Sequence, residues 1–326
     1  ARPEWRDLLM TPENMRRLAD QLARMRGAAM KVGQLISMDA GDVLPPELAQ
    51  VLARLRAEAD YMPPRQLRSV LDAEWGGGWQ RRFRRFDVRP VAAASIGQVH
   101  RAEPASGPPL AIKVQYPGIR RSIDSDVDNV ATLIRLSGLM PPGLDVAPLL
   151  AEAKRQLHEE ADYAREAGEL ARFGRLLAGD DAFRLPEPDP DLTTASVLAM
   201  TYVPGQPIER MAEADQATRD RIVGLLVDLL FRELFDWGVM QSDPNFANYR
   251  YDPDDRRLVL LDFGASRDLP AELAAAYRRL LAAGMGGDRA DLVSACEGLG
   301  LFAPDTPARL RDAVTDMAQI AFGELR

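Results

Sequence analysis

A short apolar run ends in the tripeptide Asp262-Phe263-Gly264. The run 258–261 predicts a buried strand, and a strand that ends in an aspartate presents that carboxylate at the edge of a sheet. A carboxylate there is a hard oxygen ligand, which suits Mg²⁺ that bridges the phosphates of a nucleotide. Because many ordinary strands also end in an aspartate turn, the tripeptide needs support from other residues.

Asp243 and Asn248 provide that support. They are five residues apart, which is the spacing of the kinase catalytic loop, where the aspartate orients the acceptor and the asparagine binds a second metal ion. Asp262 follows nineteen residues after Asp243. The competing explanation is an ordinary Asp-Pro turn between a helix and a strand. We therefore predict metal binding by Asn248 and Asp262 and a catalytic role for Asp243.

Lys113 lies near the end of the strand-like run Leu110-Ala111-Ile112-Lys113-Val114. An ammonium group there can reach the α- and β-phosphates of a nucleotide, as in the V-A-I-K pattern of kinases. Such a lysine needs a carboxylate partner on the following helix, and Glu166 lies on a predicted helical segment over 146–177. Lysines at strand ends are usually surface residues, so a functional role for Lys113 is supported only in combination with the other candidate residues.

The predicted helical segment around Glu166 is rich in acidic residues. Asp162 and Glu166 are four residues apart and share a face, whereas Glu160 and Asp162 are two apart and point in different directions. One regular helix cannot aim all three carboxylates at one point. The run could instead be an acidic face in contact with solvent, which is the common explanation for such a charge pattern.

The segment Ala92-Ala93-Ala94-Ser95-Ile96-Gly97 occupies the place of the glycine-rich loop that covers the phosphates in a kinase. Three alanines bring Cβ atoms and a helical preference to a position that flexible glycines normally fill. We therefore expect phosphate binding to differ from that of an ordinary kinase. A simple turn of small residues in a β meander is the alternative.

The elements around these residues predict an α+β fold in three parts. Residues 1–80 form a helical N-terminal part, with one apolar face from Met15 to Ile36 that begins after Thr11-Pro12 and with further helices after Pro45-Pro46 and Pro63-Pro64. Residues 81–205 form a small lobe with strands at 86–88, 97–99, 110–114 and 196–202 and with helices at 120–137 and 146–177. Residues 206–326 form a mainly helical lobe with a loop at 238–248.

Composition excludes several classes of protein. With 41 basic and 49 acidic residues the net charge is −8, which argues against a surface built for nucleic acid. One cysteine, Cys296, and two histidines, His100 and His158, make a thiolate or imidazole metal cluster improbable. No apolar stretch reaches 18 residues, so we expect a cytoplasmic protein, with peripheral contact with a membrane surface as an option.

The motifs together resemble one family, the UbiB-type atypical protein-kinase-like proteins, which include the ubiquinone-biosynthesis kinases and their ADCK and AarF relatives. The resemblance covers most of the chain. Its matching elements are 31–37 (K-x-G-Q-x-x-S), 92–100 (A-A-A-S-I-G-Q-V-H), Glu160 with Asp162 (E-x-D), Glu166-Ala167, Lys113, Asp243, Asn248 and Asp262.

The resemblance implies a bilobal protein-kinase-like fold with a helical N-terminal extension packed over the active site. It implies ATP or ADP with Mg²⁺ as ligands and gating of the site by Lys31, Gly33, Gln34, Glu160 and Asp162. Lys113 paired with Glu166 would hold phosphates. The implied nucleotide contacts are Ala92, Ala93, Ala94, Ser95, Ile96, Gly97, Gln98, Lys113 and the hinge residues Met200 and Tyr202. The family also implies a link to isoprenoid-quinone intermediates, a membrane surface or quinone-biosynthesis proteins as partners, and no nucleic acid.

The catalytic loop departs from the family pattern. Where the family usually has H-A-D-P-H-P-G-N, this chain has Gln241 and Ser242 before the aspartate and Asn245-Phe246-Ala247 after the proline. The carboxylate and amide ligands remain, but both histidines and the glycine beside Asn248 are absent. At the hinge, Thr201 replaces an acidic residue, which mostly backbone contacts with adenine would tolerate.

Three functions follow as hypotheses. The first is a Mg²⁺-dependent ATP-binding atypical kinase or ATPase that supports ubiquinone or related lipid metabolism. The second is a pseudokinase that binds nucleotide without turnover and recruits partners, which the altered loop would favour. The third is a small-molecule kinase, which shares the spacing of Asp243 and Asn248 but does not account for 31–37 or the alanine-rich loop.

Overall fold

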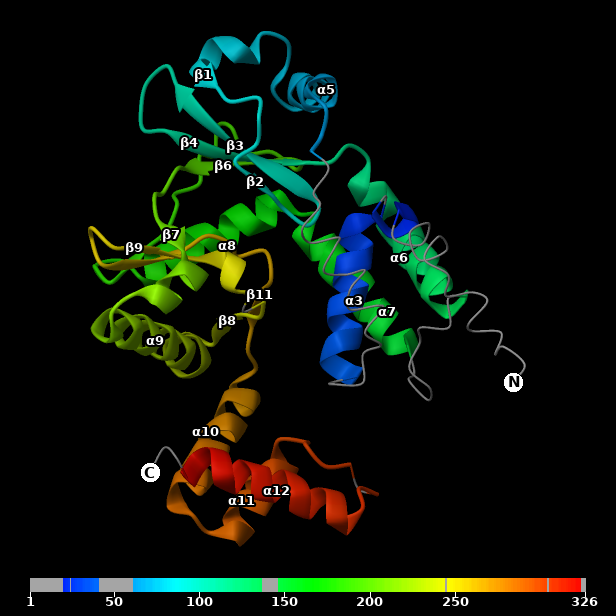
Figure 1. Cartoon of the computed structure of the whole chain (residues 1–326), viewed down its shortest axis with the longest axis vertical. Helices are drawn as coiled ribbons and strands as arrows, with labels where there is room; N and C mark the ends of the chain where they lie inside the picture. Colours follow the sequence, from blue (N-terminus) through cyan, green and yellow to red (C-terminus); the bar gives the residue numbers. More distant parts are fainter. Residues whose placement is uncertain are drawn as a thin grey trace. The chain divides into compact units, whose positions relative to one another are not determined.

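The computed structural model describes residues 20–23, 25–40, 61–136, 146–243, 245–303 and 305–323. The chain divides into two compact units (Figure 1). Unit 1 contains the described residues up to Gln206 together with 247–265, and unit 2 contains 207–246 and the residues from Ser266 onward. The helices predicted after Thr11-Pro12 and Pro45-Pro46 begin outside the described residues.

An antiparallel sheet in unit 1 carries Lys113 on an inner strand. Its strand order is β1-β3-β4-β6, and β2 pairs with β3. The predicted strands at 97–99 and 110–114 are confirmed and are longer than expected, whereas the strand expected at 86–88 ends at Phe86. The bounds are β1 Phe83–Phe86, β2 Ala92–Ala93, β3 Gly97–Pro104, β4 Leu110–Gln115 and β6 Val197–Thr201.

One face of this sheet is covered by α5 (Pro64–Trp75) and the 3₁₀ turn η2 (Trp79–Arg82). Pro64 occupies the first turn of α5, where a missing N–H costs nothing, so the helix predicted after Pro63-Pro64 is confirmed. Leu67 and Leu71 point into a core with Ile112 and Val114 from β4. This packing fixes the position of β4 and therefore of Lys113.

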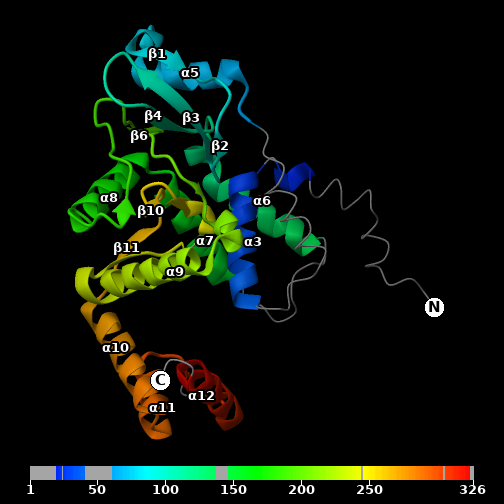
Figure 2. The same ribbon diagram turned by 60° about the vertical axis from the view of Figure 1, so that its left-hand side comes forward.

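Three helices of unit 1 pack against one another beside the sheet, as both views show (Figures 1 and 2). They are α3 (Arg26–Ala40), α6 (Ile119–Leu136) and α7 (Val146–Glu160). Ala29, Val32 and Ile36 of α3 are buried, which confirms the described part of the predicted apolar face. The periodic apolar residues of α3 therefore serve as packing surface for α6 and α7.

The helix predicted over 146–177 is broken, and this prediction of one continuous segment was wrong. α7 ends at Glu160 and α8 (Tyr163–Leu176) begins two residues after Ala161. The carboxylate of Asp162 accepts a hydrogen bond from the backbone N–H of Arg165 at 3.0 Å, so Asp162 is the N-cap of α8. The break changes the direction of the chain between Glu160 and Glu166.

A second sheet in unit 1 brings the Asp-Phe-Gly tripeptide to its position. β10 (Arg257–Leu260) pairs with β9 (Tyr249–Asp252) antiparallel and with β5 (Phe183–Arg184) parallel. The sheet order is β5-β10-β9-β7, where β7 is Gln206–Pro207. The apolar run predicted as a strand is thus β10, and Asp262 follows it after one residue, Leu261.

Unit 2 is mainly helical. Its helices are η3 (Ile208–Glu213), α9 (Gln216–Phe231), the π-helical turn η4 (Arg232–Trp237), α10 (Ala271–Gly286), α11 (Arg289–Gly298) and α12 (Ala308–Gly323). α10, α11 and α12 pack on one another (Figure 2). Within the described ranges, no helix is both long and apolar enough to span a bilayer.

The segment predicted as a loop over 238–248 contains regular structure. β8 (Val239–Gln241) pairs antiparallel with β11 (Ser266–Asp268), and a short 3₁₀ turn, η5, covers Phe246–Asn248. Gly238 has a φ of 61°, so the chain reverses there at low cost and β8 runs back beside η4. A strand of three residues carries no periodic signal, which is why the sequence did not predict it.

Candidate functional site

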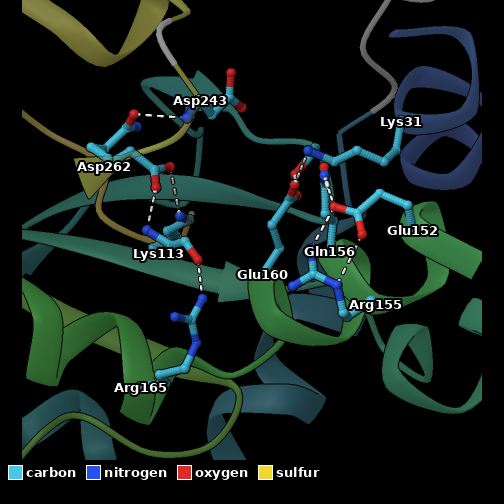
Figure 3. Close-up of polar contacts among 12 residues, drawn as sticks. Lys31, Lys113, Glu152, Arg155, Gln156, Glu160, Arg165, Asp243 and Asp262 are labelled. Carbon is cyan, nitrogen blue, oxygen red and sulfur yellow. Dashed lines mark hydrogen bonds and ion pairs between the residues drawn. The ribbon is translucent and has the colours of Figure 1, made fainter. Parts of the chain in front are cut away.

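Lys113, Glu166 and Asp262 meet beside the inner strand β4 of the first sheet, from three separate segments of unit 1. The Nζ atom of Lys113 lies 2.8 Å and 3.0 Å from the two carboxylate oxygens of Glu166. It lies 3.2 Å from Oδ2 of Asp262, the contact drawn in Figure 3. Lys113 and Glu166 are buried, whereas 36% of the Asp262 side chain is exposed. Asp262 is therefore the carboxylate of this group that a ligand can reach.

The electrostatics of this group favour an ionised lysine. Burial alone would lower the pKa of Lys113, but the charges of Asp262 and Glu166 outweigh it and hold that pKa well above its ordinary value. Burial raises the pKa of Glu166 to about 7 against the opposing effect of Lys113. The pKa of Asp262 is lowered, because Lys113 and the Gly264 N–H outweigh the effect of its burial. Asp262 thus keeps its negative charge at neutral pH.

The Asp-Phe-Gly tripeptide is held by α8 on its other side. Phe263 is buried, and its ring centroid lies 4.6 Å from that of Phe173. The N–H of Gly264 donates to Oδ1 of Asp262 at 2.9 Å, and the guanidinium of Arg165 donates to the Gly264 carbonyl. These contacts fix the Asp262 carboxylate relative to the helix that carries Glu166.

Asn248 is held through its backbone to the residue before Asp262, within unit 1. Its carbonyl accepts a hydrogen bond from the N–H of Leu261, the residue before Asp262, at 3.0 Å. An amide oxygen from Asn248 and a carboxylate oxygen from Asp262 form a donor set that suits Mg²⁺, which binds one or two protein oxygens together with phosphates and water. In the part of the chain that the structure describes, no group of three or more His, Cys, Asp or Glu residues forms a complete metal cage. The residues therefore fit a metal that arrives with a phosphate ligand.

Helix α3 reaches the alanine-rich loop through Lys31 and Glu160. The two side chains point toward one another, with 2.6 Å between Nζ and Oε1 (Figure 3). The other oxygen of Glu160 accepts a hydrogen bond from the Ser95 hydroxyl at 2.8 Å. A Cβ atom on Gly27 would lie 2.9 Å from Cγ2 of Ile96, so only glycine allows α3 to approach this closely. Lys31, Glu160 and Ser95 thus form one polar chain between α3, α7 and the loop.

The other predicted gating residues have different surroundings. Gly33 is buried within α3, while Gln34 is exposed. The Asp162 side chain is half-buried and caps α8. Glu160, Asp162 and Glu166 therefore have separate partners, which the break between α7 and α8 makes possible.

The alanine-rich loop is a β hairpin, and the helical preference of its alanines is not realised. Ala92 and Ala93 pair with Val99 and Gln98, and the N–H of Ala94 donates to the Gly97 carbonyl at 2.9 Å. Ile96 is buried. The closed turn between β2 and β3 leaves the backbone of this segment in a fixed, extended form.

Gln98 faces the core of the sheet. Its side chain is buried, accepts a hydrogen bond from the Met62 N–H at 2.7 Å and contacts His100 at 2.8 Å. The side chain is thus committed to joining β3 to the segment that leads into α5.

Met200 and Tyr202 lie at the end of β6. Met200 is buried, and the chain there pairs with Ala111 of β4. The N–H of Tyr202 donates to the Pro109 carbonyl at 2.8 Å, and its ring lies 5.0 Å from the guanidinium carbon of Arg101. Both residues are held mainly through the backbone.

Asp243 belongs to unit 2, whereas Asn248 belongs to unit 1. The backbone N–H of Asp243 donates to the side-chain oxygen of Gln241 at 2.8 Å. Asn245, Phe246 and Ala247, the residues that depart from the family pattern, are exposed. Unit 1 therefore contains six of the predicted site residues, which are Lys31, Glu160, Lys113, Glu166, Asn248 and Asp262. Asp243 is in unit 2.

Sequence reasoning missed three residues that hold the site. Tyr163 places its ring 5.1 Å from Nζ of Lys113, Arg165 binds the Gly264 carbonyl, and Phe173 packs on Phe263. All three lie on α8, within three turns of its start. A basic residue directly before Glu166, inside an acidic run, was the available signal for Arg165.

Comparison with known proteins agrees with this geometry. Residues 54–296 match the model of the ABC1 atypical kinase-like domain. The chain belongs to this family. It is 38% identical over 314 residues to the yeast mitochondrial atypical kinase COQ8 (Saccharomyces cerevisiae), covering 96% of this chain and 63% of the yeast protein. It is 40% identical to atypical kinase COQ8B of Rattus norvegicus, also mitochondrial, covering 86% of this chain and 53% of that one. The chain thus spans about half the length of these ABC1 relatives or somewhat more.

A solved structure supports the fold of this ABC1 member. The Rv3197–erythromycin complex from Mycobacterium tuberculosis matches with a TM-score of 0.63 and 28% identity, covering 93% of this chain and 78% of that one. The protein-kinase-like α+β fold implied by the motifs is therefore confirmed.

Proposed function

We propose that this ABC1 family member binds ATP with Mg²⁺ and either hydrolyses it or transfers its γ-phosphoryl group. The observation that carries the proposal is the contact of Lys113 with both Glu166 and Asp262, which combines a buried phosphate-binding cation with a reachable carboxylate. This is the pairing that kinases use to bind phosphates and metal. It comes from three distant segments of the sequence, so an incidental surface ion pair does not explain it.

Each residue then has a definite task. Lys113, fixed by Glu166, would bind the α- and β-phosphates. Asn248 and Asp262 would hold Mg²⁺, which when bound neutralises charge on the phosphate oxygens. Asp243 would orient water or an acceptor hydroxyl and accept its proton, while the oxygen attacks the γ-phosphorus and the bond to the bridging oxygen of ADP breaks.

The polar chain of Lys31, Glu160 and Ser95 supports a gating role for α3. Because Ser95 lies in the loop that would cover the phosphates, movement of α3 would move that loop. The motif resemblance adds Gly33 and Gln34 on the same helix, and Asp162 at the start of α8, to the proposed gate. The nucleotide would then lie under a lid that α3 holds in place.

The wider role that we propose is support of ubiquinone or related isoprenoid-lipid metabolism. It rests on the motif resemblance and on similarity to the yeast and rat COQ8 proteins, whose names describe them as mitochondrial atypical kinases. Lipid intermediates, a membrane surface or quinone-biosynthesis proteins are the partners that this role would require.

One observation favours a second candidate, a nucleotide-binding module without turnover. The exposed residues Asn245 to Ala247 replace the histidine, proline and glycine of the usual family loop. Asp243, Asn248 and Asp262 are all present, which favours turnover. Phosphate release by the purified protein with lipid vesicles would separate the two.

Nucleotide-dependent stability tests the proposal directly. With ADP at about 100 times its Kd, mass action predicts about 2.7 kcal/mol of stabilisation against unfolding. We expect this gain to require Mg²⁺ and to be lost in Asp262→Asn, which removes the metal-binding charge. The measurement is chemical unfolding with and without nucleotide and metal.

Matched variants control for the loss of charge. Lys154 and Asp128 form a partly exposed ion pair at 2.8 Å in the same unit, so Lys154→Met and Asp128→Asn change charge away from the site. ADP with Mg²⁺ should stabilise these variants against unfolding as much as the wild type, whereas it should not stabilise Lys113→Met. Equal stabilisation of Asp262→Asn and wild type would refute a metal–nucleotide site at Asp262.

A further inference from the structure

Glu233 is a buried carboxyl group that the site described above does not use. Only 5% of the residue is exposed, and no basic side chain forms an ion pair with it among the described residues. Its carboxyl accepts a hydrogen bond from the backbone N–H of Gln241, which opposes the rise that burial causes in its pKa. Burying such a group costs free energy, so its position calls for a reason.

The local fold brings this carboxyl to the segment that leads into Asp243. Glu233 lies in η4, a π-helical turn that continues α9 directly, and such turns alter the directions of side chains along a helix. After η4 the chain reverses at Gly238, and β8 returns beside η4. Glu233 therefore contacts the last residue of β8 across the reversal.

Gln241 connects this contact to Asp243. Its backbone N–H donates to Glu233, and its side-chain oxygen accepts the backbone N–H of Asp243 at 2.8 Å. Gln241 is itself buried, and β11 pairs with it through Ser266. Two successive hydrogen bonds thus run from Glu233 to the backbone of Asp243, all within unit 2.

We propose that Glu233 is a positioning residue, whose carboxyl acts through Gln241 to hold Asp243 in the orientation needed for turnover. The inference rests on the proposed function of Asp243 and adds a residue that the motifs did not indicate. The residues proposed to bind nucleotide are in unit 1, whereas Glu233, Gln241 and Asp243 are in unit 2. Loss of Glu233 should therefore reduce the rate of the chemical step and leave nucleotide affinity intact.

Two substitutions distinguish the role of Glu233 as a hydrogen-bond acceptor from its role in filling space. Glu233→Gln keeps an oxygen that can accept the Gln241 N–H, whereas Glu233→Met fills similar space without an acceptor. Small displacements of a catalytic group cost up to about 100-fold in rate, so we expect kcat of Glu233→Met to fall about 10- to 100-fold. Glu233→Gln should restore most of kcat, and the Kd for ADP with Mg²⁺ should be similar in both variants and wild type.

Leu229→Ala provides the control for general damage to unit 2. Leu229 is buried on α9 one helical turn before Glu233, so its truncation weakens packing without removing the acceptor. We expect lower stability but a near-normal kcat for the folded molecules. If Leu229→Ala lost as much kcat as Glu233→Met, or if Kd changed in parallel with kcat, Glu233 would be merely structural and the proposal would be overturned.

Amide hydrogen exchange tests the relay without relying on turnover. Glu233→Met should speed exchange in the segment 239–243 by about tenfold or more relative to Glu233→Gln, because both relay hydrogen bonds lose their support. Gln241→Ala should release the Asp243 amide while the contact with Glu233 remains. If Glu233→Met left the exchange rate of 239–243 unchanged, the relay would be refuted. If the wild type showed no turnover, the proposed function would be refuted, and the exchange rates would still decide whether the relay exists.

Discussion

Lys113 has two carboxylates within 3.2 Å and one of them, Glu166, is almost fully buried. A buried charge is tolerated when its partner is present and becomes costly when the partner is removed. The three residues therefore depend on one another for stability as well as for the proposed phosphate binding.

Removing the lysine should reveal this dependence. We expect Lys113→Met to lower the free energy of unfolding by about 3 kcal/mol, because Glu166 is left buried without a counter-charge. Lys154→Met, in a pair whose aspartate is exposed, should cost less than about 1 kcal/mol. Adding Glu166→Gln to Lys113→Met should recover part of the loss. Urea denaturation measures all three, and equal losses for the two lysine variants would contradict the buried pair.

Glu233 predicts a pH dependence of stability whose sign follows from its pKa. Burial raises that pKa from 4.5 in the unfolded chain to about 8 in the folded state. Between these values the folded state keeps a proton that the unfolded state releases, so this contribution to stability is complete below pH 4.5 and declines toward pH 8. The unfolding free energy of the wild type minus that of Glu233→Gln should therefore decrease as pH rises. Denaturation at pH 5, 6, 7 and 8 tests this, and a constant difference would show that Glu233 does not hold its proton.

Helix α8 is the element on which the site depends most. It carries Glu166, Arg165, Tyr163 and Phe173, so its start and direction set the position of Lys113 and of the Asp-Phe-Gly tripeptide. Its first turn is fixed by the Asp162 cap. A change at this cap should thus affect ligand binding as well as stability.

Two helix caps give a matched test of this role. Asp162 caps α8 and Asp288 caps α11, each accepting backbone N–H groups at 3.0 Å or less. Alanine at either position should cost about 1 kcal/mol of stability. Only Asp162→Ala should weaken ADP binding, because only α8 carries Glu166. Calorimetry with Mg²⁺ and ADP provides the affinity, and an equal effect of both variants on Kd would contradict the assignment.

The elements show what sequence reasoning could and could not find. Lys113 and Glu166 were predicted as a pair because the V-A-I-K pattern calls for a carboxylate partner on a following helix, and the pair is formed across a separation of 53 residues. The break at Ala161-Asp162 was not found, since apolar periodicity continues across it and a cap is a contact of a few atoms. Strands β8 and β11 have three residues each, too few for a pattern to emerge.

Burial of a polar side chain was equally hard to foresee. Glu233 stands in a helical sequence where a glutamate would ordinarily face solvent, yet it is buried, one turn after the buried Leu229. Arg165 likewise finds its partner 99 residues away, at the Gly264 carbonyl. Such contacts depend on the packed tertiary structure, which local sequence patterns do not encode.

At the level of the whole molecule, the residues proposed for nucleotide and metal lie in one of the two compact units. Lys31, Lys113, Glu166, Asn248 and Asp262 are all in unit 1, together with the alanine-rich loop. The response to nucleotide should therefore be local. Unit 2 contributes the α10–α12 helices, whose packing involves none of these residues.

Hydrogen exchange over the whole chain should show this difference. We expect ADP with Mg²⁺ to slow amide exchange in β4, in α8 and in the segment 247–265, because ligand binding suppresses local opening of the structure around it. Exchange in the α10–α12 helices should change little. In Asp262→Asn, ADP with Mg²⁺ should not slow exchange in any of these segments. Protection confined to α10–α12 would contradict a nucleotide site in unit 1.

Neither unit is continuous in the sequence, since the chain leaves unit 1 after Gln206, returns at Ala247 and leaves again after Ala265. On the ribosome, Lys113 and Glu166 are therefore synthesised well before Asp262, which follows Glu166 by 96 residues. β5 is likewise synthesised before β10, the strand with which it pairs in parallel. At ordinary rates of translation the interval from Gln206 to Ala265 lasts about 3 to 12 seconds. During that time the nascent chain has Lys113 and Glu166 without Asp262, and β5 without a strand to pair with, so the proposed nucleotide site is complete only after this return segment has emerged.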